Sequence, residues 1–307
     1  MRKVIAIDHG NRMIKTPNTA FSAGFMESGH LPTMRGDVLV YSGKEYTLTE
    51  KRVNQKNDKT RNEDYFILTL FAIGKELLET NNKEQSLYEG EGIQVHLLIG
   101  LPPLHYRALH RRFEEYFKER GQISFKVNGE RFEIEIAGVQ AFPQAYSAAV
   151  TIYDEIKDER ILNIVDIGGY TVDCLRLLDF KAVMDTCTSL YSGINGLFKQ
   201  INALIRATGA QDLPDVMIED ILLNNSKALR SRYVELIREQ ARKYATDLLF
   251  QIADTGLDLN EHKTVFVGGG SALLKEYLMA DDRLHKAIFI EDPKANAKGY
   301  KRMYDSR

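Results

Sequence analysis

The chain has 307 residues, of which 44% are hydrophobic and 27% charged, and its formal net charge is −2. These values are typical of a globular protein with about two domains, and the balanced charge argues against nucleic-acid binding by the chain as a whole. No apolar run approaches the roughly 18 residues of a membrane span, and a strand begins directly after the first three residues, so we expect a cytoplasmic protein without a signal peptide. Cys174 and Cys187 lack metal-ligand spacing and are expected to be buried free thiols.

The first half of the chain mixes short strands, hairpins and helices. Alternating apolar residues and turn residues predict strands and hairpins, and apolar residues at helical spacing predict helices. The elements that we expect, in chain order, are a strand at 4–7, a second strand within 15–24, a hairpin over 37–48, an exposed charged loop at 50–64, a helix over 65–79, a strand at 93–101, a helix over 104–120, a hairpin over 125–136 around Asn128-Gly129, and an Ala-rich helix from Pro143 to about 156.

The second half restarts the same pattern. The expected elements are strands at 161–165, 172–178 and 182–190, a helix opened by Gly193 and running to about 208, a helical or irregular segment at 216–223, a long amphipathic helix over 226–254, a strand at 264–267, a helix over 272–279, a strand at 287–290 and a final helix from about 295. Strands followed by strand–helix units in both halves predict an internal structural duplication of the α/β class, with mixed sheets.

One pattern occurs twice along the chain. An apolar strand ends in aspartate and runs into a glycine turn with small polar residues, as Asp8-His9-Gly10-Asn11 and as Asp166-Ile167-Gly168-Gly169-Tyr170-Thr171-Val172-Asp173. A third glycine turn, Gly268-Gly269-Gly270-Ser271, follows the strand expected at 264–267. Taken singly, the first and third turns are also typical of a tight turn and of a strand-to-helix loop. Their occurrence together, in this order, favours a shared function.

These residue types suit a ligand that carries phosphate and magnesium. An aspartate at a strand end can hold Mg²⁺ through its water shell, and glycine lets the backbone approach phosphate oxygens. Asn11, Thr171 and Ser271 add side-chain donors, and Lys15 adds a positive charge. Turns of this kind in both halves therefore predict two related half-molecules that close on one phosphate-bearing ligand.

The motifs resemble those of the actin-like ATPase superfamily. Pro143-Gln144 with the following Ala-rich helix resembles the first interdomain connection of that family, and Pro293-x-Ala295-Asn296-Ala297-x-Gly299-Tyr300 resembles the second. All five motifs occur in family order and span almost the whole chain. The resemblance implies an actin-like fold with two ribonuclease-H-like domains, each with a mixed sheet, flanking a nucleotide cleft. We expect domain I at 1–158, with the helix at 294–307 packing back on it, and domain II at 159–293.

Within the superfamily, the chain is most similar to the bacterial plasmid-segregation group, the ParM/StbA-like proteins. The short chain, the strand end at 99–102 and the C-terminal motif at 295–300 carry this resemblance. It implies a filament that polymerises with Mg²⁺ and ATP, or GTP, disassembles after hydrolysis and segregates plasmid DNA. The implied partners are further copies of the chain and a DNA-binding adaptor protein at a centromere-like plasmid site, without direct specific DNA binding and without a membrane.

The resemblance also implies a role for each motif residue. Asp8 and Asp166 would hold hydrated Mg²⁺, Gln144 would orient the attacking water, and Asp166 would share the catalytic role. The other implied phosphate and nucleotide contacts are Gly10, Asn11, Lys15, Gly168, Gly169, Tyr170, Thr171, Asp173, Gly193, Glu219, Gly268, Gly269, Gly270 and Ser271. We expect His9 to be a turn residue beside the site, and Tyr170 either to cover the phosphates or to change how tightly nucleotide is held.

Two alternatives stay open at this point. A sugar or acid kinase of the same superfamily needs a catalytic aspartate for a substrate hydroxyl, and the sequence offers only the motif aspartates for that task. A cell-shape or division homologue commonly carries a membrane-binding amphipathic end, whereas the last helix has only Tyr300, Met303 and Tyr304 as bulky apolar residues. If the chain forms filaments, the hairpin near Gly43 and the charged loop at 50–64 are the expected longitudinal contacts.

Overall fold

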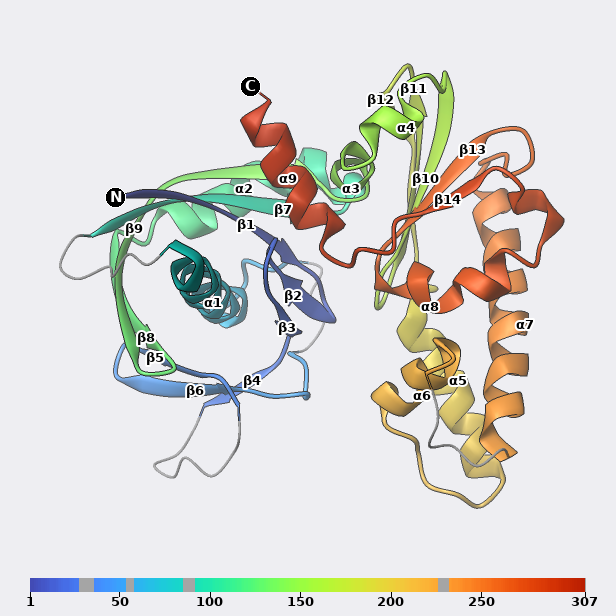
Figure 1. Cartoon of the computed structure of the whole chain (residues 1–307), viewed down its shortest axis with the longest axis horizontal. Coiled ribbons are helices and arrows are strands. Elements are labelled where there is room, and N and C mark those ends of the chain that lie inside the picture. The colour runs from blue at the N-terminus through green and yellow to red at the C-terminus, as the bar shows by residue number, and fades with distance from the viewer. Residues whose placement is uncertain (28–35, 54–57, 85–91, 226–231, 307) are drawn as a thin grey trace. The chain divides into compact units, whose positions relative to one another are not determined.

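The computed structural model describes residues 1–27, 36–53, 58–84, 92–225 and 232–306. The chain divides into two compact units, one comprising Met1–Thr151 with Lys294–Arg307 and the other Ile152–Pro293. The division thus falls between 151 and 152, where the sequence-based boundary stood between 158 and 159. Figure 1 shows the elements of both units, which are described separately here.

The first unit is built on a nine-stranded mixed sheet in the order β3-β2-β1-β7-β9-β8-β5-β6-β4. Only the β1–β7 and β7–β9 pairs are parallel, and all other neighbours are antiparallel. The strands are β1 (Arg2–His9), β2 (Met13–Lys15), β3 (Ala20–Ser22), β4 (Phe25–Glu27), β5 (Val38–Tyr41), β6 (Lys44–Leu48), β7 (Ile93–Leu101), β8 (Gln122–Val127) and β9 (Glu130–Pro143).

Helix α1 (Asp64–Glu84) forms the centre of this unit, inside the curve of the sheet (Figure 1). Residues 65–74 of this helix are all buried, because apolar side chains stand on every side of its first turns rather than on one stripe. Helices α2 (Pro103–Lys118), α3 (Tyr146–Val150) and α9 (Ala295–Asp305) complete the unit. The predicted helices at 65–79 and 104–120 are confirmed, and the first of them runs five residues further.

The two hairpins expected from turn residues are both present. Ser42 and Gly43 join β5 to β6 with φ values of 51° and 75°, and Asn128 and Gly129 join β8 to β9 with 52° and 90°. Two successive residues with positive φ give the tight two-residue turn that Asn-Gly favours. Strand β9 continues well beyond the expected 136, to Pro143, because its second part pairs in parallel with β7.

The second unit has a five-stranded mixed sheet in the order β12-β11-β10-β13-β14. Its strands are β10 (Ile161–Ile167), β11 (Val172–Leu178), β12 (Lys181–Leu190), β13 (Lys263–Val267) and β14 (Ala287–Phe289), and its helices are α4 (Tyr153–Ile156), α5 (Ile194–Ala207), α6 (Asp215–Leu222), α7 (Arg232–Asp254) and α8 (Gly269–Leu278), with a short 3-10 turn, η1 (Asp282–Leu284). Strands β10, β13 and β14 are parallel, and β11 and β12 are antiparallel to their neighbours. The first unit contains the same arrangement, with the same strand directions, in its strands β3-β2-β1-β7-β9. This correspondence confirms the predicted duplication.

Two expectations about local structure were wrong. The Ala-rich helix after Pro143 is two short helices, α3 and α4, because the carbonyl of Thr151 accepts from the Arg302 guanidinium at 2.9 Å and Ile152 leaves helical geometry with φ −114° and ψ 26°. The loop at 50–64 is not simply exposed, since Lys59 is buried. Part of that loop, 54–57, and the expected start of the long helix, 226–231, lie outside the described residues.

Both cysteines are buried and free, as expected. Burial raises the pKa of Cys174 to about 12, so its thiol stays protonated near neutral pH. Among the described residues, no helix is long and apolar enough to cross a membrane.

Candidate functional site

Three motif residues of the first unit meet at the end of β1. Asp8, the penultimate residue of this strand, is 3% exposed and lies opposite Lys15 of β2 in the antiparallel register. The Lys15 ammonium is 3.7 Å from one oxygen of the Asp8 carboxylate, and the Gln144 amide nitrogen donates to the other at 2.6 Å. The motif residues at 8, 15 and 144 are thus brought together by strand pairing and by the end of β9. They give this corner a buried carboxylate, a cation and an amide.

The first turn of α1 holds the side chain of Asn11. The Tyr65 hydroxyl donates to the Asn11 amide oxygen at 2.9 Å, which leaves the nitrogen of the Asn11 amide as its donor side. The turn before it is tight, because a Cβ on Gly10 would lie 2.5 Å from the carbonyl oxygen of Met13. Gly10 therefore lets the chain close between β1 and β2 where no other residue fits.

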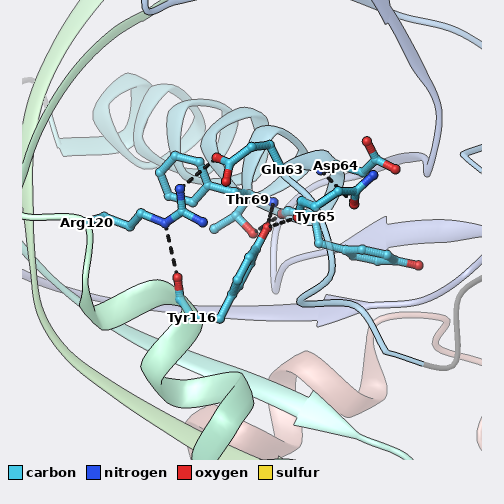
Figure 2. A network of polar contacts seen from close by, with 8 residues as sticks. Glu63, Asp64, Tyr65, Thr69, Tyr116 and Arg120 are labelled. Carbon is cyan, nitrogen blue, oxygen red and sulfur yellow. Dashed lines mark hydrogen bonds and ion pairs between the residues drawn. The ribbon is translucent and has the colours of Figure 1, made fainter.

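The start of α1 is itself fixed by α2 (Figure 2). The hydroxyl of Tyr116 donates to the Asn62 carbonyl at 2.7 Å and accepts from the Phe66 amide at 3.1 Å. Arg120 pairs with Glu63 at 2.7 Å and lies 4.2 Å from the centre of the Phe66 ring. The hydrogen bond from the Phe66 amide satisfies a backbone group in the first turn of the helix. Together these contacts fix Tyr65, and through Tyr65 they fix the loop that carries Asn11.

His9 is a core residue rather than a turn residue beside the site. It is fully buried, stacks on Phe117 at 5.4 Å between ring centres and meets Phe113 edge-on at 5.6 Å. Its Nε2 lies 2.8 Å from the Thr69 hydroxyl, which in turn donates to the Tyr65 carbonyl at 2.6 Å. Because that hydroxyl uses its proton on the carbonyl, His9 must donate, and its proton is on Nε2. Burial, followed by the nearby charge of Lys59, lowers the pKa of His9 to about 3, so the ring is neutral at physiological pH.

Lys59 is a residue of this corner that the sequence did not reveal. It is 9% exposed, its ammonium donates to the carbonyl of His9, and it lies 5.2 Å from the centre of the Tyr65 ring. Asp58 beside it accepts from Thr60 and pairs with Arg112 of α2 at 3.0 Å, contacts that hold its pKa below the usual value despite partial burial. The buried Lys59 ammonium thus contacts the chain where β1 ends and the loop to β2 begins. Lys59 itself belongs to a segment whose sequence predicts an exposed polar loop.

In the second unit, the glycine turn at 168–171 is joined to the start of α5. The first two amides of this helix donate to the carbonyls of Gly168 and Gly169, at 3.0 and 2.9 Å. A Cβ on Gly193 would lie 2.5 Å from the carbonyl carbon of Tyr170, so only glycine allows this approach. The buried Tyr244 hydroxyl of α7 donates to the Gly193 carbonyl at 2.9 Å. Gly193 therefore supports the turn through its backbone, and Tyr170 is half-buried above it.

The third glycine turn lies directly on the second motif. Gly268 has φ 89° and ψ 162°, and a Cβ there would be 2.3 Å from an oxygen of the Asp166 carboxylate. A Cβ on Gly270 would collide with Ile167 at 2.5 Å. Residues a hundred positions apart in sequence thus share one corner, at the neighbouring ends of β10 and β13 and the start of α8. The N-terminus of a helix favours negative charge.

The remaining motif residues of this unit have mixed placements. The Ser271 hydroxyl donates to the Gly268 carbonyl at 2.7 Å, so it stabilises the turn. The Thr171 hydroxyl donates to Asp173 at 3.2 Å, next to the turn. Glu219 is half-buried on α6, a helix that packs against α7 and α8.

The residues present fit magnesium held through water. Asp8 and Asp166 supply hard oxygen donors at equivalent strand ends, and both are nearly buried. Within the described part of the chain there is no cluster of three or more His, Cys, Asp or Glu side chains that could form a complete metal site. Each of these carboxylates, taken within its own unit, suits Mg²⁺, which keeps several waters and takes one or two carboxylates together with substrate phosphates.

Two family models match successive parts of the chain. Residues 6–146 match the family model "Actin like proteins N terminal domain", and residues 164–280 match "Archaeal actin homologue MreB-like, C-terminal". Both models describe actin-like proteins, and together they cover most of the chain, which belongs to the actin-like superfamily. The predicted α/β fold with two mixed-sheet domains of the actin-like kind is confirmed.

Solved structures show the same fold over the full length. A 15-stranded ParM filament from Clostridium botulinum is 18% identical, with 100% of each chain covered and a TM-score of 0.76. An archaeal actin homologue in complex with ADP is 17% identical, with 99% of each chain covered and a TM-score of 0.76. A ParM protein without ligand is 13% identical, with 99% of this chain and 97% of that chain covered and a TM-score of 0.71. No curated protein sequence matches the chain.

Proposed function

We propose that the chain is a filament-forming actin-like NTPase that binds ATP or GTP with Mg²⁺ and hydrolyses it. The observation that carries this proposal is the equivalence of the two aspartate corners. Asp8 is the penultimate residue of β1 and Asp166 is the penultimate residue of β10. These two strands occupy equivalent places in the five-strand arrangement that both sheets contain, and each is followed by a glycine turn. A duplicated fold that keeps an aspartate and a glycine turn at the same strand end in both copies is best explained if both copies act on one ligand.

The two corners would divide the work. In the second unit, Gly268 and the turn at 168–171 bring backbone close to Asp166, which suits phosphate and nucleoside. In the first unit, Lys15 adds positive charge and Gln144 offers an amide beside Asp8. When bound, Mg²⁺ would neutralise phosphate charge, with Asp8 and Asp166 holding it through water.

Gln144 is the candidate for directing hydrolysis. In hydrolysis, a water oxygen bonds to the γ-phosphorus, and the bond from that phosphorus to the bridging oxygen breaks with its electron pair on the leaving nucleoside diphosphate. The protons of the water pass to phosphate oxygens and solvent, and inorganic phosphate is released. A neutral amide cannot remove the water proton near neutral pH, so Gln144 would orient the water, as a glutamine does in other NTPases. Its hydrogen bond to Asp8 at 2.6 Å holds the side chain in place for that task.

Self-assembly and plasmid segregation are proposed by analogy with the relatives. The similar ParM structure is a filament, and the similar archaeal homologue binds ADP. Nucleotide binding would favour a domain arrangement that adds to a filament, and hydrolysis would weaken the filament. A separate DNA-binding adaptor protein would connect the filament to plasmid DNA, because the chain's net charge of −2 does not favour direct DNA binding.

A deletion that includes Lys59, such as one of residues 55–61, would be a poor test of the surface expected to make longitudinal contacts. Such a deletion would remove buried Lys59 and damage the corner at Asp8. The Arg61 side chain is 75% exposed and the hairpin tip at Ser42 and Gly43 is exposed, so R61E and lengthening of the tip alter mainly exposed groups. R61E also replaces the ion pair between Arg61 and Asp58, at 3.9 Å, with two like charges.

The decisive experiment measures sedimentation and phosphate release together. The chain is incubated with Mg²⁺ and ATP, GTP, ADP or no nucleotide, and pelleted at high speed. We expect pelleting only with a triphosphate, with phosphate release that lags behind assembly. D166A should lose Mg²⁺-dependent turnover, whereas D212A, which removes an exposed carboxylate from the same unit, should keep it.

Two outcomes would contradict the proposal. Pelleting that does not depend on nucleotide would remove the link between the corners and assembly. An absence of pelleting, with steady turnover only when a sugar or acid is added, would indicate a kinase of the same superfamily.

A further inference from the structure

The backbone directly after Gln144 is strained. Ala145 has φ 62° and ψ −60°, although it is not glycine, and it is fully buried. The amide of Tyr146 donates to the Gln144 carbonyl at 2.6 Å, which closes a three-residue γ-turn with a positive φ at its centre. This form of γ-turn is rare because the Cβ of the central residue is crowded. Such a turn persists only when its surroundings impose it.

A residue from the far end of the chain supplies one of those constraints. The Asn296 amide oxygen accepts from the Ala145 amide at 2.9 Å, across 151 positions of sequence, and both residues are buried. Asn296 thus provides an acceptor for a buried backbone donor that would be costly if left unsatisfied.

Helix α9, which carries Asn296, is seated with little freedom. A Cβ on Gly299 would lie 1.8 Å from the carbonyl oxygen of Ser147, so the two backbones are in direct contact. A Cβ on Gly100 would lie 1.9 Å from the hydroxyl of Tyr300, whose ring stacks on Phe142 at 5.7 Å between centres. Glycine at these two positions thus lets α9 approach α3 and the end of β7 more closely than any side chain would allow. The position of Asn296 is fixed as a result.

Gln144 lies between these constraints. Its amide donates to the Leu101 carbonyl of β7 at 2.8 Å, and its side chain donates to Asp8 at 2.6 Å. The direction in which the chain leaves Gln144 is set by the γ-turn at Ala145. A relaxed turn would rotate the Gln144 carbonyl and move the origin of the side chain relative to Asp8.

We propose that Asn296 is a positioning residue, which holds the strained turn at Ala145 and thereby fixes the side chain of Gln144 beside Asp8. This proposal deepens the hydrolytic function proposed above and rests on it. Asn296 is not one of the residues assigned above to the nucleotide, so its loss should change where Gln144 points and leave the proposed ligand contacts in place. The expected kinetic effect is a kcat lower on the order of tenfold in N296A, with the nucleotide Kd changed by less than about twofold, since small misplacements of a positioning group slow the reaction without weakening binding.

The test uses two readouts on the full chain. The first is hydrogen exchange of the Ala145 and Tyr146 amides without nucleotide, with the Ala149 amide, which bonds to the Ala145 carbonyl at 3.0 Å within α3, as an internal reference. N296A should speed exchange at 145 and 146 more than at 149. The second readout is kcat and Kd for ATP and GTP.

Three further variants separate positioning from general damage. N296D keeps an oxygen acceptor at the same place and should retain protection and most of kcat. N202A removes the same chemistry elsewhere, because the Asn202 amide oxygen accepts from the Leu213 amide at 2.9 Å in the second unit, and it should leave both readouts unchanged. A145G in the N296A background should recover part of kcat, because glycine adopts this φ without steric cost.

The outcomes distinguish this proposal from the proposed function. Normal hydrogen exchange at 145 and 146 in N296A would show that Asn296 does not hold the turn at Ala145, whatever the chain hydrolyses. Faster exchange with unchanged kcat in a chain that does hydrolyse nucleotide overturns the positioning role. Faster exchange in a chain with no turnover would support the structural role of Asn296 at the turn and would reject the hydrolytic function instead.

Discussion

Buried His9 should make the stability of the protein sensitive to acid. The ring is neutral in the folded state with a pKa of about 3, and in the unfolded chain its pKa is 6.5. Between these two values the unfolded chain binds a proton that the folded chain cannot accept, so the free energy of unfolding rises with pH across this window. Phe113 and Phe117 pack against the ring, and the nearby charge of Lys59 also opposes its protonation.

The size of the effect follows from the two pKa values. Each pH unit within the window changes the free energy of unfolding by about 1.4 kcal/mol. Lowering the pH from about 7.5 to about 5 should therefore reduce this free energy by about 2 kcal/mol through His9 alone. Substitution by phenylalanine keeps the aromatic stack and removes the titration. At about pH 7.5 it should cost only about 1 kcal/mol, because the Thr69 hydroxyl loses one donor and keeps its bond to the Tyr65 carbonyl.

The assay is urea unfolding of the wild type and H9F at several pH values between these limits. The difference between the two curves cancels the titration of all other groups, and it should shrink or reverse as the pH falls. H285F, which removes an exposed histidine, should run parallel to the wild type. If H9F also ran parallel to the wild type, the folded pKa of His9 would have to be near its ordinary value, and the burial argument would be refuted.

Three further changes test the corners. G268A should cost about 1–3 kcal/mol for the backbone and weaken nucleotide binding, because its Cβ would meet Asp166; G256A, with the same φ of 89° but nothing within 4 Å, should cost less in thermal unfolding and leave binding intact. K59M should cost about 1–3 kcal/mol and raise the pKa of His9, while exposed K51M should stay within about 0.5 kcal/mol of the wild type in urea. D166A should abolish Mg²⁺-dependent phosphate release, and normal release would reject the site assignment.

The features that sequence predicted well are those with a local physical signal. Asn128-Gly129 adopts positive φ at two successive positions, and that requirement is visible in the residue types themselves. Gly268 is predictable in the same way, because the conformation it adopts is almost closed to other residues. The aspartates at the ends of β1 and β10 follow from an apolar run that stops at a charge.

The features that sequence missed depend on contacts between distant segments. Lys59 lies in a run of polar residues, and nothing local distinguishes it from exposed Lys51, because its burial is imposed by α1 and by the carbonyl of His9. His9 was expected in a turn, since a polar residue after a strand usually leaves the core. The pocket formed by α1 and α2 reverses that preference.

The two corners also show how one duplicated fold can support unequal tasks. Near the end of β10, Gly268 brings its backbone close to one oxygen of the Asp166 carboxylate. At the end of β1, the neighbours of Asp8 are an amide and an ammonium, both from side chains. Backbone groups can bind phosphate, but a single substitution cannot change their hydrogen-bonding chemistry. Side chains, in contrast, can orient a water molecule. On the function proposed here, the second unit therefore serves mainly binding, and the first unit carries the group that decides the rate, which is also the group that Asn296 holds in place.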